Sequence, residues 1–588
     1  MAVVGSRGVE RTLLGDAAYD VLPAYTSEPV ETRMRSNKPF EANCHAHSPE
    51  EGMIRIGYVG GGILDDVRRR LPYYIDDYKQ CWNRKTLSSS IFLFFTTFAS
   101  TVALGVVINR NTACPKNSRD NCDPESSYIG VAEMLLMNSV AGMIHAVAGC
   151  QPLLILRPTG PITAFLSLLF NTSRSLKLDF LQFLVWTGIF VGIYMTGVAI
   201  FELSRFVKYS TRFLHDIFAC FVCTIYVVDG VQGVSKRMMS ADGSKNPGEH
   251  HSVAGAIFAL LLTLILLVVA LKLHGMLQSR LFTRRLNILL VDYALAVSAL
   301  LCICISYFPG KVVHVDRISD LDHINGYNVT PTLKYLNGEH RSFGVQLSSF
   351  GGEAAAGAVA ALPIVTFFYF DQNFSSLLCQ LESMHLKKGS YFHSSFLCMA
   401  VFNIVGPFCG LPFVTGSLPH SPQMVKALTT VREGATAPDR LPSVSENRVA
   451  PFLIYLFIGT ALITPFGRAV IMTIPEAVVD GILIFVGVAG IFDTQLWERV
   501  QLMFMEFDNF PKESKYTQVA PKRMHMFTVI QVTSLAVAWS LNGLAMVVPS
   551  LAPLGLCFPI VIVLLVPLRE TLIPRIFTPE ELAYLDSH

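Results

Sequence analysis

This sequence is short of charge, because only 15% of its 588 residues are Asp, Glu, Lys or Arg. Soluble proteins carry about 25%, so an ordinary soluble enzyme and a charge-rich disordered chain are both excluded. The formal net charge of +2 gives no reason to expect a nucleic-acid partner. The sequence also lacks a metal-ligand cluster, a phosphate-binding loop and a nucleophile triad, so we expect neither an enzyme nor a cofactor or metal.

Residues 1–85 are polar and lack the short apolar core and small-residue cleavage site of a signal peptide. The part up to about Pro49 has the composition of a disordered tail. Basic residues then gather just before the first apolar segment: Arg68, Arg69, Arg70, Lys79, Arg84 and Lys85. The positive-inside rule therefore predicts a cytosolic N-terminus.

Apolar windows of the length that spans a bilayer, roughly 18 to 24 residues, make up most of the remaining chain. Hydrophobic residues are 52% of the total. The expected spans lie at 88–108, 128–149, 153–170, 180–202, 213–234, 252–272, 286–306, 354–377, 393–411, 413–430, 449–471, 474–492, 525–548 and 551–570. We therefore predict an all-α polytopic membrane protein with about 14 transmembrane segments, seven in each half.

This count divides the chain into five parts. They are a cytosolic N-terminal region (1–85), a first repeat (86–308), an extracellular loop (309–348), a second repeat (349–570) and a cytosolic tail (571–588). The glycosylation sequon at Asn328 falls in the loop that this topology places outside. The absence of a retention signal favours the plasma membrane.

Most of the 13 cysteines lie in apolar segments. Cys220 and Cys223 have the spacing of a redox pair, but without a second pair we interpret them as small core residues. Cys114 and Cys122 differ because they share a polar loop after the first span. A disulfide and two free thiols remain equal alternatives there.

Two spans are interrupted by proline and glycine, and each is the third of its half. Residues 151–170 contain Pro158, Gly160 and Pro161, and residues 411–428 contain Gly416, Pro419 and Pro422. Such a matched pair indicates the binding site of a transporter. The alternative is that the prolines only kink ordinary helices.

Each break predicts an extended strand followed by a half-helix that begins inside the membrane. The first amides of a half-helix have no intrahelical acceptor, so together with the helix dipole they favour an anion. The predicted substrate-binding residues at the two breaks are Arg157, Thr159, Gly160, Thr415, His420 and Ser421. Arg157 either attracts the anion or pairs with a carboxylate, and the sequence does not decide between these roles.

Asp371 lies inside the eighth span, with Ser375 one helical turn later. A carboxylate at that depth costs several kcal/mol, so we assign both residues to the substrate site. The alternative is a structural carboxylate. Glu133 and Asp292 lie nearer span ends and suit helix capping or interfacial roles, and His145 is interpreted as a packed polar residue.

The segment 497–510 has charges on one face and Met, Phe and Leu on the other. That pattern predicts an amphipathic helix in the membrane interface, after the twelfth span.

The sequence also resembles the solute carrier family 4 bicarbonate and borate transporters from about Gly61 to its end. The motifs that carry the resemblance are DVRRRLPYYIDDY, GMIHAVAGCQPLLIL, YFDQNFSSLL, HLKKGSYFHSSF, GLPFVTGSLPHSPQMVKAL and FTPEELAYLD. The resemblance implies two inverted repeats of seven segments, core and gate domains, and a homodimer formed through the gate. It also implies a substrate site at the half-helices of segments 3 and 10.

Within this family the chain looks most like the plant and fungal borate branch. Animal chloride/bicarbonate exchangers carry an arginine at the position of His420 and have a large cytosolic domain before the first span. The sequence RPTGPITAF differs from both branches.

We therefore predict a secondary active transporter of a small inorganic anion, with borate slightly favoured over bicarbonate. Asp371 is expected to couple transport to protons or sodium. A bicarbonate transporter or anion exchanger is the first alternative. A passive conduit for protons, hydroxide or water, with Asp371 and His145 as the relay, is the alternative from another class.

Overall fold

The computed structural model describes residues 49–586 except for short gaps. The gaps are 80, 82, 115–121, 124–125, 242–251, 279–280, 311, 319–330, 338, 348–349, 431–442, 507–509, 512–513 and 548–551. The predicted tail and the Asn328 sequon lie outside the described residues. Within the described part, the chain forms a bundle of helices with only two small two-stranded sheets.

Eight helical stretches are long and apolar enough to cross a membrane. They are α3 (Arg84–Asn111), α4 (Val131–Ala148), α6 (Phe180–Ile200), α7 (Arg212–Ser240), α8 (Val253–His274), α12 (Gly352–Cys379), α19 (Pro521–Val547) and a last stretch made of α20 (Ala552–Gly555), α21 (Phe558–Thr571) and α22 (Ile573–Ile576). The predicted spans at these places are confirmed, with shifts of a few residues at their ends.

Three more spans are helix pairs with a sharp bend. They are α9 (Arg284–Asp292) with α10 (Ala294–Ile305) at 70°, α15 (Val449–Ile463) with α16 (Pro465–Met472) at 83°, and α17 (Glu476–Phe492) with α18 (Gln495–Met503) at 74°. The shorter apolar helix α13 (His393–Phe408) is another. The two interrupted spans are strand β1 (Leu156–Arg157) with helix α5 (Gly160–Leu176), and strand β2 (Thr415–Gly416) with helix α14 (His420–Leu428). Together these make the fourteen predicted segments.

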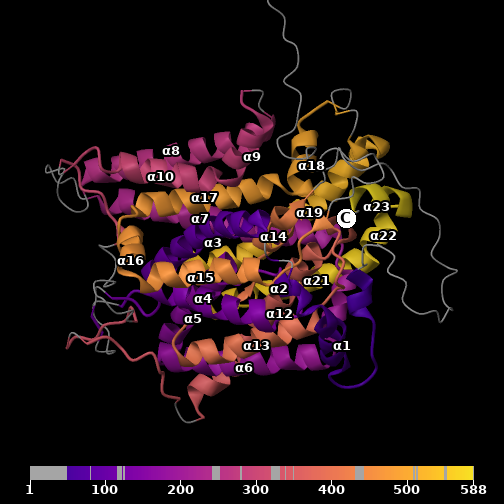
Figure 1. Cartoon of the computed structure of the whole chain (residues 1–588), viewed down its shortest axis with the longest axis horizontal. Coiled ribbons are helices and arrows are strands. Elements are labelled where there is room, and N and C mark those ends of the chain that lie inside the picture. Colours follow the sequence, from indigo (N-terminus) through magenta and orange to yellow (C-terminus); the bar gives the residue numbers. More distant parts are fainter. Residues whose placement is uncertain are drawn as a thin grey trace, which may run out of the picture.

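The helices pack as two groups. The core, as we define it, is α3, α4, α5, α6, α12, α13, α14 and α15, and the gate is α7, α8, α10, α17, α19 and α21. In Figure 1 the gate helices α8, α10 and α17 lie at the top and the core helices α6 and α13 at the bottom. Contacts across the boundary include α3 against α17 and α5 against α7.

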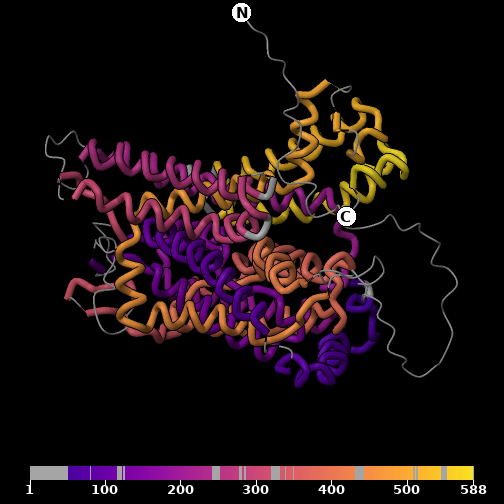
Figure 2. Tube along the Cα trace, turned by 45° about the horizontal axis from the view of Figure 1, so that its top comes forward, coloured from indigo at the N-terminus to yellow at the C-terminus, as the bar shows by residue number. Residues whose placement is uncertain are grey.

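Both described ends of the chain lie at one end of the bundle. Helix α1 (Gly61–Arg70) and helix α23 (Pro579–Leu585) are on the right in Figure 1, opposite α16, and Figure 2 places the corresponding indigo and yellow segments at the same end. An even number of spans requires this arrangement.

A buried cluster of charges fixes the N-terminal segment to the core. Asp77, in helix α2 (Asp76–Lys79), accepts from Arg70 Nη2 at 2.5 Å. Its carboxylate also pairs with Lys388 Nζ at 2.8 Å and Arg448 Nε at 3.0 Å. One fully buried carboxylate therefore holds cations from three separate stretches of chain.

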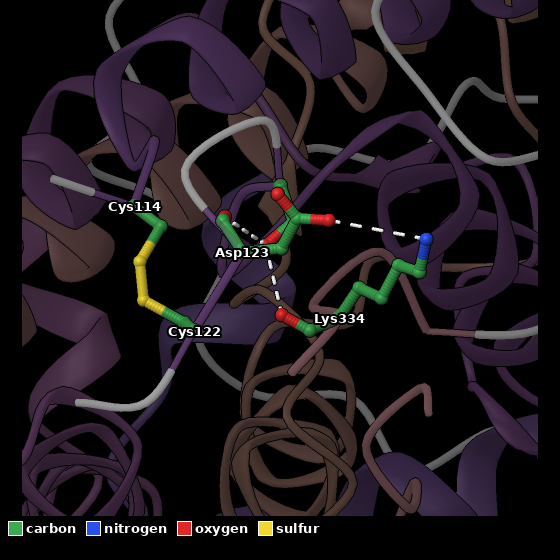
Figure 3. The surroundings of a disulfide bond; sticks show 5 residues. Cys114, Cys122, Asp123 and Lys334 are labelled. Atoms are coloured by element: carbon green, nitrogen blue, oxygen red, sulfur yellow. Dashed lines mark hydrogen bonds and ion pairs between the residues drawn. A yellow bond between two sulfur atoms is a disulfide. The ribbon is translucent and has the colours of Figure 1, made fainter. Parts of the chain in front are cut away.

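Cys114 and Cys122 form a disulfide, with Cα atoms 6.3 Å apart, so the first of the two alternatives for this pair is confirmed. Figure 3 shows its surroundings, where the Asp123 amide donates to the Lys334 carbonyl at 2.9 Å. The loop after α3 is thereby tied to the central loop. Cys220 and Cys223 are free thiols in α7.

Glu133 caps a helix, as predicted. Its Oε2 accepts from the Gly130 amide at 3.0 Å at the start of α4, and its Oε1 accepts from the Thr332 amide at 2.7 Å. The same carboxylate therefore also anchors the central loop. Asp292 ends α9, at the bend before α10.

The predicted amphipathic helix over 497–510 is shorter than expected, because helix α18 ends at Met503. It is bent by 74° from α17, and its place in the membrane interface stays a prediction. Arg499 is fully buried, and its Nη2 lies 3.2 Å from Asp216 Oδ2 in α7. This ion pair holds Arg499 of α18 against gate helix α7.

Candidate functional site

The two interrupted spans meet at their breaks. Strands β1 and β2 pair antiparallel, with Leu156 opposite Gly416 and Arg157 opposite Thr415. Proline occupies the first turn of α5, and Pro419 precedes the first residue of α14. Because proline fixes φ and suits the first turn of a helix, each strand is followed directly by a half-helix. The predicted strand-and-half-helix geometry is therefore present, and kinks in ordinary helices do not describe it.

Helix α12 lies directly against this crossing. A Cβ built on Gly416 would lie 2.6 Å from Gln372 Oε1 and 3.0 Å from Ser375 Cβ, so glycine at this position favours the close approach. Asp371 and Ser375 are both buried here. Thr159 Oγ1, at the N-terminal cap position of α5, donates to Asp371 Oδ2 at 3.4 Å.

Arg157 is fully buried at the crossing. Its Nη1 donates to Ser100 Oγ at 2.5 Å and its Nε to the Pro158 carbonyl at 3.1 Å. Its Nη2 is buried and has no hydrogen-bond partner among the described residues, and no carboxylate there lies within ion-pair distance of the guanidinium. The sequence left two roles open for Arg157, and both stay predictions.

His420 is the first residue of α14 and also faces Arg157. Its Nδ1 lies 2.8 Å from Ser417 Oγ, and its Nε2 lies 3.3 Å from Arg157 Nη1. A guanidinium nitrogen can only donate, so Nε2 must accept. This contact therefore requires a neutral imidazole.

Two of the predicted site residues already have protein partners. Ser421 Oγ accepts from the Ile155 amide at 3.1 Å, which ties the chain before β1 to α14. The Gly160 amide donates to the hydroxyl of Tyr226 at 3.0 Å. Tyr226 lies in gate helix α7, and the sequence offered no signal for it because α7 has no feature that points to the breaks.

His145 lies apart from these contacts, in α4. It is 1% exposed, and its Nε2 lies 3.3 Å from Ser395 Oγ in α13. This environment is that of a packed polar residue. The described contacts do not link it to Asp371 as a relay would require.

Many apolar spans, with two broken ones crossed at a buried arginine and a buried carboxylate, define a multi-pass membrane protein with the architecture of a transporter. The chain belongs to the family described as the HCO3- transporter integral membrane domain, whose profile matches residues 58–252 and 237–588.

Relatives are anion exchange proteins. Mouse "Anion exchange protein 3" is 26% identical over 576 residues, covering 92% of this chain and 44% of the relative. Human "Band 3 anion transport protein" is 25% identical over 579 residues, covering 96% of this chain and 60% of the relative. The chain thus spans about half the length of the curated relatives it matches.

Two solved structures are similar to the chain at a low level. The transmembrane domain of the cyanobacterial bicarbonate transporter BicA has a TM-score of 0.46 at 16% identity, covering 77% of this chain and 97% of that one. The murine solute carrier 26 family member A9, in its inward-facing state, has a TM-score of 0.47 at 12% identity, covering 83% and 68%.

Proposed function

We propose that the chain is a secondary transporter of a small inorganic oxyanion, moved by alternating access of the core against the gate. The observation that carries the proposal is Arg157, a permanent cation that is buried with one nitrogen unpartnered. Burying an unpaired charge is costly, so a bound anion is the partner that the site lacks. Arg157, Thr159, Asp371 and His420 are the residues we assign to the substrate.

The crossing supplies the remaining features of such a site. Thr415 lies opposite Arg157 on β2, and Ser375 lies beside Gly416. The half-helix N-termini at Gly160 and Ser421 carry the positive ends of their dipoles. Oxyanions accept several hydrogen bonds at once, and Arg157 offers a planar fork of donors that suits them.

The sequence argument for borate depended on the neutral side chain at His420. Arg157 brings a cation to 3.3 Å from that imidazole, so the site holds one positive charge, as it would with an arginine at position 420. The descriptions of the family and of its relatives favour bicarbonate and other anions. We therefore propose borate and bicarbonate as the two substrates to be compared.

Purified protein in liposomes distinguishes these substrates. Borate, bicarbonate and chloride are offered in turn while internal pH and anion content are recorded. Saturable uptake of one oxyanion supports the carrier. A current that rises linearly with voltage, without saturation by any anion, supports the passive conduit and contradicts the carrier.

We assign Asp371 to coupling with a proton or sodium ion. Its carboxylate accepts a hydrogen bond from Thr159 at 3.4 Å and lies at the proposed anion site, where it repels the anion's charge. Asp371→Asn should keep anion binding and remove the dependence of uptake on the cation gradient. Asp292→Asn, at the bend between α9 and α10, is the matched control. If anion uptake by Asp371→Asn still depends on the cation gradient, Asp371 has a structural role and does not couple transport to the cation.

We also propose a homodimer formed through the gate, at the plasma membrane, with cytosolic termini. Helix α8 exposes a stripe of large apolar residues that suits a partner subunit or lipid: Ile257, Leu261, Leu264 and Val268. A tag after residue 586 that is reached only from outside intact cells would contradict the orientation. A monomer in mild detergent at every concentration would contradict the dimer.

A further inference from the structure

Tyr226 crosses from the gate to the first amide of a core half-helix. Its ring is so close to Gly160 that a Cβ built there would lie 2.8 Å from Tyr226 Cζ. The tyrosine is 5% exposed, and its hydroxyl accepts from the Gly160 amide at 3.0 Å. Helix α7 belongs to the gate and α5 to the core, as defined above.

This hydroxyl occupies a position that an anion would otherwise take. The first amides of a helix have no intrahelical acceptor, and Pro161 removes one of those donors from α5. The charged groups that act on the Tyr226 hydroxyl are Arg157 and Asp371, which are the charged residues of the crossing. A neutral phenol oxygen therefore stands at the positive end of the half-helix, beside the site.

We propose that Tyr226 is a latch that holds the empty core against the gate and that the transported anion releases. This inference rests on the proposed function, because it uses the same anion site. Hydrogen bonds to an ionised acceptor are about twice as strong as neutral ones. An oxyanion therefore displaces the phenol from the Gly160 amide, whereas without an anion the phenol returns.

The latch has a consequence for transport. A core that is bound to the gate when empty crosses slowly, so an anion must be carried in each direction. The latch thus favours exchange of anions over net movement of one anion. Tyr226 thus takes part in coupling, although the sequences of α7 and of the two breaks give no indication of such a role.

Tyr226→Phe tests the latch because it removes the hydroxyl and keeps the ring. Labelled bicarbonate efflux from proteoliposomes is measured with and without bicarbonate on the opposite side. We expect the ratio of net flux to exchange to rise at least several-fold in Tyr226→Phe and the KM for bicarbonate to fall. An unchanged ratio overturns the latch.

Tyr455→Phe is the matched control. The Tyr455 hydroxyl donates to the Leu156 carbonyl at 3.0 Å, so it contacts the same crossing but joins two core elements. Its loss should alter net flux and exchange in proportion and leave their ratio unchanged. A rise in the ratio equal to that of Tyr226→Phe would overturn the assignment to Tyr226.

Hydrogen exchange of the anion-free protein gives a readout that needs no transport. The peptide covering the start of α5 should exchange faster in Tyr226→Phe, because the Gly160 amide loses its acceptor, and addition of bicarbonate should slow it again. If the wild type does not transport bicarbonate, bicarbonate is not the substrate, and the hydrogen-exchange rate at the start of α5 tests the latch by itself. Faster exchange then supports the latch, and unchanged exchange overturns it.

Discussion

Arg157 Nη1 lies 3.3 Å from His420 Nε2, although 263 positions separate the two residues in the sequence. The guanidinium stands on a strand and the imidazole at the start of a half-helix, so the crossing of β1 and β2 creates the contact. The positive charge of the site is therefore held by the strand of segment 3. The imidazole, as a neutral acceptor, fixes the direction of the guanidinium.

Arg157→Gln should weaken anion binding without lowering stability. A charged hydrogen bond contributes about 1.5–3 kcal/mol, so affinity should fall by about 10- to 150-fold. The folded state meanwhile loses an unpaired buried charge. We expect bicarbonate or borate to raise the Tm of wild type and not that of the variant. Arg523→Gln, at the exposed pair with Glu581, is the control. An equal anion-dependent rise in Arg157→Gln would contradict the assignment.

The close approach of β2 to α12 should depend on Gly416. In Gly416→Ala the new Cβ meets Gln372 Oε1 at 2.6 Å and Ser375 Cβ at 3.0 Å, so the Gln372 side chain must turn away and the contact with Ser375 must widen. We expect anion uptake to fall at least tenfold while the protein still reaches the membrane. Gly197→Ala in α6, where a Cβ meets nothing within 4 Å, is the control. Normal uptake by Gly416→Ala would show that the crossing tolerates displacement.

The sequence predicts the two breaks well because proline and glycine act locally. Pro158 and Pro161 disrupt a helix wherever they stand, and the matching break near Pro419 follows the same local rule. Tyr226 was not predictable, because its contact with Gly160 depends on how a gate helix packs against the core. The environment of Arg499 was missed for a related reason: an amphipathic pattern is the same whether the polar face meets solvent or a buried partner such as Asp216.

Asp77 should be among the most sensitive positions for stability. It is fully buried between Arg70, Lys388 and Arg448, so Asp77→Asn removes a charge that three cations share. Arg70 then keeps only Glu446 at 3.8 Å, and Lys388 keeps Asp76 at 3.0 Å, among the described carboxylates. Breaking a buried ion pair from one side costs about 3–5 kcal/mol.

Thermal unfolding in detergent measures the effect of Asp77→Asn. Asp123→Asn, which loses a partly exposed pair with Lys334 at 3.9 Å, is the comparison and should cost less than about 1 kcal/mol. Equal losses in the two variants would mean that the cluster around Asp77 contributes no more than a surface pair.

The Cys114–Cys122 disulfide should stabilise the loop after α3 and its attachment to the central loop. It closes a loop of separation 8, and the chain-entropy estimate for so short a loop is about 2–3 kcal/mol. Replacing both cysteines with serine should lower Tm, and a reductant should lower the Tm of wild type and not of the variant. Cys304→Ser, at an exposed free thiol, is the control. A variant that still responds to the reductant would show that another bond is responsible.

The attachment of α1 to the core should weaken as pH rises towards neutrality. Burial raises the pKa of Asp66 from 3.8 to about 7, against the opposing effects of the Ser394 amide at 2.9 Å and of Arg69. Asp65 raises it slightly further, and the Cys150 thiol is a neighbouring titratable group. When α1 detaches, Asp66 enters water and regains its ordinary pKa. The attached state therefore binds the proton more tightly than the detached state.

Protonated Asp66 therefore favours the attached state of α1. Stability from this group is fully present below about pH 4, is lost as pH rises to about 7, and is constant above that. Hydrogen exchange of α1 peptides between pH 5.5 and 8.5, corrected for intrinsic rates, should show protection falling by up to about tenfold per pH unit below pH 7. Asp66→Asn should remove this slope, because its side chain does not titrate, whereas Asp65→Asn should retain it. Equal slopes in wild type and Asp66→Asn would show that another group controls the attachment of α1.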